Sequence, residues 1–382
     1  MIFDLTKEQK LVSETVRKIA QKELLERASE IDNTGSFVWE GLRKLKEADI
    51  LGIAIPSEYG GMGMDTLSFV LAIEEIAKTC ASTSLAVLSH SICSYIILSA
   101  GNDEQKKKYL PKMAKGEILG AFCVHESNCG SNALALETKA VLKEDKYVVN
   151  GSKIFITNAQ EAEIYAVLVR TDPSKGPQGI SMLLIEKNTG GFSFGKKEEK
   201  MGLRGTSSRE LFFQDCRIPK ENLLGKEGEG LKIVGQAIVG FGFLGASAIS
   251  LGIAQVALDT SLKHAKERII AGTPIGANQL IQSLITEMSL GVDTTRDILY
   301  LAALEKDKNS STYSIVDALK IKLYASEVAI DITNKALQIY GGHGYCKEFP
   351  LERYYRDARG LALHFKTTEL LKAEIGKNLI GL

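Results

Sequence analysis

The sequence predicts an α+β protein with three domains in the order helical, β, helical. Three observations support this prediction. Apolar residues recur at helical spacing over the first 120 residues, short runs rich in β-branched and aromatic residues follow, and helical spacing returns from about Gly228. We therefore expect an N-terminal helical domain over residues 1–120, a central β-barrel or sandwich over 121–227 and a C-terminal four-helix bundle over 228–382.

The N-terminal domain carries helix signals from its first residues. Thr6 precedes Glu8 and Gln9, a pattern typical of a helix start. Apolar stretches between turn residues predict four further helices, over residues 40–50, 65–79, 82–100 and 103–115.

The central and C-terminal parts differ in their periodicity. Turn residues separate the apolar runs between residues 121 and 225, which predicts five to seven strands, and Asn150-Gly151 predicts a hairpin turn among them. Helical spacing then extends over 228–271, 276–306, 312–340 and 366–380. Long helices joined by short loops predict an antiparallel bundle.

Composition excludes several classes of protein. The 382 residues suffice for two to three domains, and 47 basic residues balance 47 acidic ones, which argues against a dedicated nucleic-acid binder. Six scattered cysteines without a CxxC pair predict neither a disulfide framework nor a metal site. The start has no basic segment followed by an apolar one, and no uninterrupted apolar run is long enough to span a membrane. We therefore expect a cytoplasmic protein with no membrane span.

Three segments carry more specific information than the periodicity does. AFCVHESNCGSNALAL (121–136) is a strand that runs into a turn, and KIFITNA (153–159) has an aromatic residue two positions before a threonine. ALQIYGGHGY (336–345) is a helix that ends at Gly341-Gly342, where a backbone without side chains can approach a ligand closely.

These segments, in this order, resemble the acyl-CoA dehydrogenase family over essentially the whole chain. Further matching segments are GNDEQKKKYLPKM (101–113), KMGLRGTSS (200–208), IPKENLLGKEGEG (218–230), LGIAQVALD (251–259) and LERYYRDAR (351–359). The resemblance implies an FAD-dependent flavoprotein oxidoreductase that acts on an acyl thioester. It also implies that an electron-transferring flavoprotein or similar acceptor is the partner and that the protein is a homotetramer.

The resemblance also implies which residues hold the cofactor. Two groups would flank the flavin ring, with Thr157 donating toward flavin N5, and a third group would hold the pyrophosphate and adenosine, where an arginine can bond two phosphate oxygens. The expected cofactor residues are Phe122, Val124, His125, Gly130, Ser131, Phe155, Ile156, Thr157, Arg268, Gln279, Gln338, Gly342 and Thr367.

The sequence departs from the family at the catalytic base. The glutamate that removes the proton alpha to the thioester carbonyl is replaced by Phe365, and the stretch 239–247, which carries the base in some members, contains no acid. A positioned base contributes about 10²–10⁴-fold to a rate. His364, beside Phe365, and His90, on a helix that lines the acyl pocket in the family, are the candidate catalytic substitutes.

The substrate channel is altered as well. Ser131, Phe243 and Phe365 are the expected substrate contacts, and Gly240 and Phe243 stand where the family usually has an acid and an arginine. The glycines at 235, 240, 242, 245 and 252 fit either close helix packing or room for a substrate group, and the loss of two polar contacts favours room.

Several functions fit these departures. The first is oxidation of an alicyclic or unsaturated acyl-CoA with a relocated base or none. The alternatives are a carrier-protein thioester as substrate, a desulfinase-like reaction in which sulfinate leaves, and a catalytically inactive structural homologue.

Overall fold

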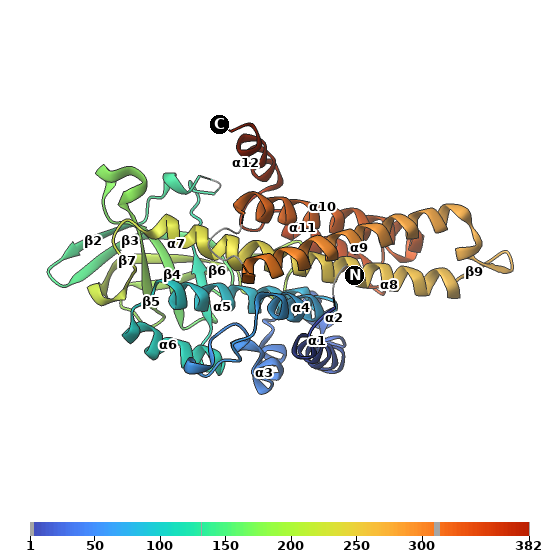
Figure 1. The fold of residues 1–382 in the computed structure, drawn as a ribbon, viewed down its shortest axis with the longest axis horizontal. Coiled ribbons are helices and arrows are strands. Elements are labelled where there is room, and N and C mark those ends of the chain that lie inside the picture. The colour runs from blue at the N-terminus through green and yellow to red at the C-terminus, as the bar shows by residue number, and fades with distance from the viewer. Residues whose placement is uncertain (1–3, 131, 309–313, 382) are drawn as a thin grey trace.

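The computed structural model describes residues 4–130, 132–308 and 314–381. Helices of the N-terminal part lie along one side of the molecule, the β-sheet lies at one end, and the long C-terminal helices extend as an arm toward the other end (Figure 1). This is the three-part architecture that the sequence predicts.

The N-terminal part contains six α-helices in the described residues. They are α1 (Lys7–Ile19), α2 (Arg27–Thr34), α3 (Trp39–Glu47), α4 (Thr66–Ala77), α5 (Ala81–Ala100) and α6 (Asp103–Ala114). Helix α1 begins as expected, because the Thr6 side chain accepts from the Gln9 amide while the Gln9 side chain accepts from the Thr6 amide. Helix α4 is buried over its whole length and forms the centre of this part of the core.

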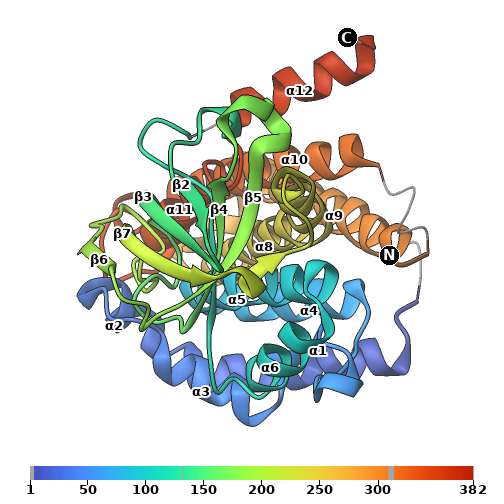
Figure 2. The ribbon, with the colours of Figure 1, turned by 90° about the vertical axis from the view of Figure 1, so that its left-hand side faces the viewer.

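The central part is one eight-stranded sheet in the described residues. Its strands are β1 (Gly120–Cys123), β2 (Lys139–Lys143), β3 (Lys146–Ile156), β4 (Ile164–Arg170), β5 (Ile180–Glu186), β6 (Phe192–Lys197), β7 (Arg209–Pro219) and β8 (Leu223–Leu224). The order is β6-β7-β3-β2-β4-β5-β8, with β1 parallel to β4 (Figure 2). The expected count of five to seven strands was too low because short strands such as the two-residue β8 leave little pattern in the sequence.

The hairpin predicted at Asn150-Gly151 is wrong. These residues lie inside the continuous strand β3, where the pairing with β7 shifts register between Val149 and Gly151. Asn150 bonds Asp215 of β7 through its side chain, and a Cβ on Gly151 would lie 2.7 Å from the Thr138 Cα. Gly151 therefore serves a β-bulge and a close backbone approach.

The C-terminal part is dominated by long antiparallel helices. It contains α7 (Gly230–Ala237), a π-helical turn (Ile238–Gly242), α8 (Phe243–Glu267), α9 (Gln279–Lys308), α10 (Ile315–Tyr340), α11 (Leu351–Leu361) and α12 (Thr368–Ile380). A two-stranded ribbon, β9 (Ile269–Ile270) with β10 (Thr273–Pro274), closes the far end of the arm (Figure 1). Helix α12 packs against α10 through the buried Leu371 and Ile375, and its C-terminal end projects from the bundle (Figure 1).

Gly245 and Gly252 of α8 serve packing, which corrects the preference for substrate room at these two positions. A Cβ on Gly245 would lie 2.3 Å from the Leu88 side chain of α5, and one on Gly252 would lie 2.6 Å from the Glu74 carbonyl of α4. The helices approach so closely there that larger residues are excluded. Gly240 in the π-helical turn has the Lys306 side chain 3.3 Å from an added Cβ, and a Cβ on Gly235 would meet nothing within 4 Å.

Two helical stretches of the described residues are long and apolar enough to cross a membrane. They are Ala81–Ala100 and Gly230–Glu267, and 89% of each tested window is buried inside the structure. They are therefore the central helices of the core. All six cysteines are free, and no group of metal-ligating side chains occurs among the described residues.

Candidate active site

The three parts of the molecule meet around a cavity of about 60 Å³. The end of β1, the end of β3, one face of α5 and the loop before α12 each contribute to its wall. The lining residues are Leu85, Ser89, Ile92, Phe122, His125, Phe155, Ile156, Thr157, His364 and Phe365. This set includes the two segments that the sequence analysis placed on either side of a flavin ring.

The β-sheet presents an aromatic wall to this cavity. The side chain of Phe155 is 62% exposed although it is a large apolar residue, and its φ of 54° lies in the left-handed region. Such a conformation costs a bulky residue about 1–3 kcal/mol and persists where the surrounding structure requires it. A ring-shaped ligand in the cavity can pack against this exposed, strained aromatic side chain.

His125 is held in the wall by the residues behind it. The fully buried Lys153 ammonium lies 2.6 Å from the Glu126 carboxylate, which also accepts from the amides of Glu137 and Thr138. These bonds fix the chain on the C-terminal side of His125. Burial lowers the pKa of His125, and the nearby Lys153 charge acts in the same direction, so the imidazole is neutral at pH 7.

Helix α5 lines the cavity with a face that excludes His90. Leu85, Ser89 and Ile92 follow one another at helical spacing, whereas His90 points away from them. The Nδ1 of His90 accepts from the Gly120 amide at 3.2 Å and its Nε2 has no partner in the described structure, while burial lowers its pKa to about 4. His90 therefore ties α5 to β1, and nothing in the structure supports it as the catalytic base.

His364 lies in the cavity wall, and one of its two ring nitrogens is hydrogen-bonded to the backbone. Its Nδ1 is 2.8 Å from the Gly360 carbonyl oxygen. Because a carbonyl can only accept, Nδ1 carries the proton and Nε2 is left as an acceptor. Burial lowers the pKa of His364 to about 4, and the Lys322 charge acts in the same direction, so this imidazole is also neutral at pH 7.

Phe365, which the sequence analysis aligns with the family's glutamate, lies beside His364 in the cavity wall. Its φ is 62°, and its ring meets Phe243 edge-on with centroids 6.5 Å apart. A Cβ on Gly242 would lie 3.6 Å from the Phe365 ring. Phe365 therefore packs against the stretch 239–247, and the described residues that line the cavity include no carboxylate.

The loop that carries His364 and Phe365 depends on a residue that the sequence analysis missed. Lys322 of α10 is 1% exposed, and its Nζ donates to the carbonyls of Ala362 at 3.2 Å and Lys366 at 2.7 Å. Burial lowers its pKa to about 8. The available signal was a lysine on the apolar face of a helix, between Leu319 and Ala325.

A second, open cavity of about 400 Å³ lies at the end of α10. Arg268, Gln338 and Gly342 line it, as do the stacked rings of His264 and Tyr340, whose centroids are 3.8 Å apart. Nothing lies within 4 Å of a Cβ added to Gly341 or Gly342, so packing does not require glycine there. An open glycine backbone beside an arginine is a suitable cradle for a phosphate group.

The structure does not bring every expected residue into these cavities. Val124 is buried in the strand end, Gly130 lies on the surface, and neither lines either cavity. Gln279 and Thr367 lie outside both cavities too, and Phe243 lies behind Phe365. Ser131 lies outside the described residues. Contact of all these residues with a cofactor or substrate stays a prediction.

Comparison with known proteins agrees with the architecture. Three family models match: the acyl-CoA dehydrogenase N-terminal domain over residues 6–117, the middle domain over 121–216 and the C-terminal domain over 228–380. The short-chain specific acyl-CoA dehydrogenase of Clostridium acetobutylicum is 41% identical over 376 residues, which cover 98% of each chain.

Solved structures show the same similarity. Butyryl-CoA dehydrogenase from Megasphaera elsdenii superposes with a TM-score of 0.96 at 37% identity over 100% of both chains. The prolyl acyl carrier protein oxidase AnaB superposes with a TM-score of 0.94 at 29% identity, over 98% of this chain and 100% of that one.

Proposed function

The chain belongs to the acyl-CoA dehydrogenase family, and from that premise we propose that it oxidises an acyl thioester without the usual glutamate base. Membership makes it an FAD-dependent oxidoreductase. The observation that carries the proposal is the composition of the cavity wall, which contains two histidines, Phe365 and no carboxylate among the described residues.

The residues present fit FAD. The apolar cavity beside the exposed Phe155 suits the ring system, and Arg268 beside the open Gly341-Gly342 backbone suits the pyrophosphate. FAD supplies the hydride acceptor when it is bound. Phe122 and Thr157 would orient the ring, and the half-buried Phe365 with the buried Phe243 behind it would keep water from the reacting carbon atoms.

His364 is the base that the geometry favours. Its Nε2 is the unprotonated nitrogen, and its Nδ1 bond to Gly360 fixes the ring. An imidazole with a pKa of about 4 is a weak proton acceptor, so it suits a substrate whose proton is already acidic. An unsaturated acyl group, alicyclic or open-chain, meets that requirement where its double bond extends the delocalisation of the resulting anion.

Anaerobic addition of acyl thioesters to the FAD-loaded enzyme tests this function through bleaching of the yellow flavin absorbance. His364→Ala should slow bleaching about 10²–10⁴-fold at unchanged FAD content, because a general base contributes about that much. His90→Ala is the matched control and should bleach at the wild-type rate if it folds with full FAD content. Wild-type bleaching in His364→Ala would exclude His364 as the base.

Phe365→Glu is the converse test. It places a carboxylate at the family position and should allow bleaching by simple saturated acyl-CoAs. If no thioester bleaches the wild-type enzyme or Phe365→Glu, the inactive-homologue alternative is supported.

A carrier-protein thioester is the second candidate substrate, favoured by the similarity to the prolyl acyl carrier protein oxidase. The same acyl group presented on CoA and on a carrier protein separates the two. Bleaching by the carrier-bound form alone would establish this alternative.

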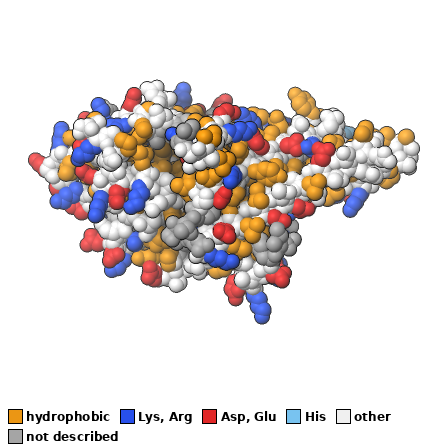
Figure 3. Space-filling view, turned by 45° about the horizontal axis from the view of Figure 1, so that its top comes forward, with side chains coloured by type: hydrophobic (Ala, Val, Ile, Leu, Met, Phe, Trp, Pro, Cys, Tyr) orange, Lys and Arg blue, Asp and Glu red, His pale blue; other side chains and the backbone are white. Residues whose placement is uncertain are grey.

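We also propose that the protein is a cytoplasmic homotetramer that passes electrons to an electron-transferring flavoprotein or similar acceptor. Ile269, Ile270, Leu280 and Leu290 on the helical arm are between 52% and 75% exposed, and hydrophobic side chains gather across the middle of the face in Figure 3. Such apolar surface is typical of an interface. Six free cysteines suit a reducing compartment.

A further inference from the structure

A basic segment follows strand β6. Residues 195–209 contain Lys196, Lys197, Lys200, Arg204 and Arg209 against Glu198 and Glu199, so this segment carries a net positive charge although the chain as a whole is balanced. Lys197, Lys200 and Arg204 line a cavity of about 270 Å³ between this segment and the end of α2. We call these three residues the basic cluster.

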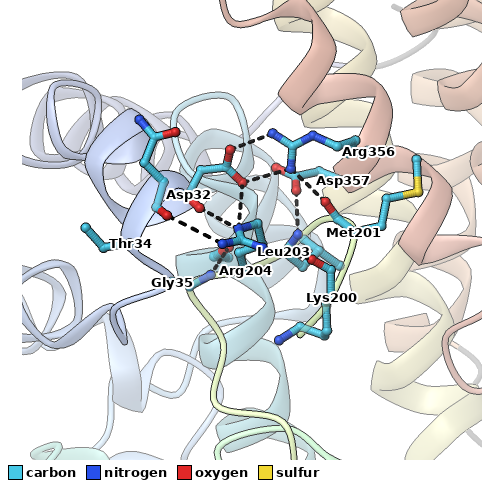
Figure 4. Close-up of polar contacts among 12 residues, drawn as sticks. Asp32, Thr34, Gly35, Lys200, Met201, Leu203, Arg204, Arg356 and Asp357 are labelled. Atoms are coloured by element: carbon cyan, nitrogen blue, oxygen red, sulfur yellow. Dashed lines mark hydrogen bonds and ion pairs between the residues drawn. The ribbon is translucent and has the colours of Figure 1, made fainter. Parts of the chain in front are cut away.

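Two of the three cations in the basic cluster lack a carboxylate partner. Lys197 donates to the Gly35 carbonyl and Lys200 to the Thr206 carbonyl at 2.9 Å, and no carboxylate pairs with either lysine in the described structure. Arg204 bonds the Asp32 carbonyl at 2.6 Å and forms an ion pair with the Asp32 carboxylate at 4.0 Å. The Asp32 carboxylate itself is held by Arg356, at 2.5 and 2.9 Å. Figure 4 shows the Lys200 side chain directed away from these contacts.

The lysines experience one another's charge. Burial lowers the pKa of Lys200 to about 8, the charges of Lys197 and Arg204 act in the same direction, and the charges of Glu198 and Asp357 oppose the shift. Glu198 and Glu199 also line the cavity without forming an ion pair to the cluster. An anion brought against these cations would relieve their mutual repulsion.

The basic cluster lies next to the exposed wall of the candidate active site. Lys197 pairs with Arg209 across β6 and β7, and Arg209 pairs with Ile156 across β7 and β3. Neighbouring strands are about 4.8 Å apart, so the backbone of Lys197 lies roughly 10 Å from that of Ile156. Ile156 follows Phe155, the exposed aromatic residue of the cavity wall.

We propose that the basic cluster is the docking site for an acidic electron-accepting protein, which collects electrons at the Phe155 side of the cavity. This inference rests on the proposed function. Each thioester oxidised gives two electrons to the acceptor and two protons to solvent. Glu198 and Glu199 would repel a dianionic phosphate, whereas a protein surface can place carboxylates on the cations and its own cations on these two residues.

The test needs no thioester substrate. The FAD-loaded enzyme is reduced with dithionite, and its reoxidation is followed with ferricyanide, a trivalent anion, and with ferricenium, a monovalent cation. The wild-type rate with ferricyanide should fall with added salt and with added polyglutamate, which occupies the basic cluster. Polylysine should leave it unchanged.

The variant Lys197→Gln/Lys200→Gln removes two charges outside the proposed catalytic and cofactor-binding residues. Its reoxidation by ferricyanide at low salt should be about tenfold slower, because electrostatic steering accelerates encounter by 10-fold or more. Its reoxidation by ferricenium should not be slower. Lys107→Gln/Lys112→Gln, on the exposed face of α6, is the control with the same charge change and should match the wild type.

Equal ferricyanide rates in the Lys197→Gln/Lys200→Gln variant and the wild type would overturn the docking site alone. A protein that stays colourless with added FAD would overturn the proposed function and this inference with it. A loss of rate with both probes would indicate damage to the flavin site and would also count against docking.

Discussion

At the residue scale, the direction in which a side chain points from its helix or strand decides whether it reaches the cavity. Four expected cofactor residues, Phe122, His125, Phe155 and Thr157, line one cavity together with the candidate base His364 and the expected substrate contact Phe365. The motifs that contain them are local, so the sequence specifies them directly. Ser89 lines the cavity and its neighbour His90 does not, because successive residues of a helix point about 100° apart. Only the rotation of α5 in the core decides which residue faces inward.

Asp357 gives a residue-scale prediction about pH. It is buried, its Oδ1 accepts from the Leu203 amide at 2.5 Å, and burial raises its pKa to about 6 from 3.8 (Figure 4). Between those pH values the folded state binds more protons than the unfolded state, so this group makes stability fall as pH rises. Its share of the loss between pH 5 and pH 7 is roughly 1 kcal/mol.

Asp357→Asn keeps an oxygen for the Leu203 amide and cannot ionise. The change in free energy of unfolding between pH 5 and pH 7, measured by denaturant titration, should shift by that amount. Asp317→Asn, at an exposed position, should retain the wild-type profile. Identical profiles for Asp357→Asn and the wild type would contradict the raised pKa.

At the element scale, the helices were predicted well and the sheet less well. Long amphipathic or apolar stretches specify α1, α4, α5 and the bundle helices through local spacing. The hairpin prediction at Asn150-Gly151 was wrong because a β-bulge and a hairpin turn use the same residue types. Only the pairing of β3 with β7 decides which of the two forms. The glycines of α8 could be interpreted only with α4 and α5 in place.

Lys322 supports an element-scale prediction about the loop 362–366. Lys322→Met removes the two donors that hold the Ala362 and Lys366 carbonyls, and each buried unpaired acceptor costs about 1–3 kcal/mol. The amides of His364–Lys366 should exchange with solvent at least tenfold faster, measured by hydrogen–deuterium exchange. Lys320→Met, two residues earlier and exposed, is the control. Unchanged exchange in Lys322→Met would show that the loop holds its shape without the lysine.

At the scale of the whole molecule, a balanced total charge conceals an uneven distribution. The composition argues against a dedicated nucleic-acid binder, but it could not show that the cations at the end of β6 and in the loop after it converge on one cavity. The order of the three domains was predictable because each has its own periodicity. How they meet was not, since Asp32, Leu203 and Asp357 come together from three parts of the chain.

Arg268 supports a prediction about assembly and cofactor together. It is exposed and lines the open cavity with Gly342, and in the proposed homotetramer we expect a further copy to complete this site. Arg268→Ala should weaken FAD retention about 10–100-fold, because a hydrogen bond to a charged group contributes about 1.5–3 kcal/mol. The ratio of flavin to protein absorbance after gel filtration measures it.

Lys263→Ala, also exposed on α8, should retain FAD and elute at four times the 41.6 kDa chain mass. Elution of the FAD-loaded wild type as a monomer would rule out the assembly. Full FAD content in Arg268→Ala would show that Arg268 does not hold the cofactor.

One thiol gives experimental access to the open cavity at the end of α10. Cys346 is the exposed member of the six cysteines and lies in the wall of that cavity, while the other five are buried. An alkylating dye therefore reacts at a single, known place on the folded chain. Its rate of attachment reports directly whether this pocket is empty, filled by nucleotide or covered by another subunit, without any need to know what the enzyme oxidises.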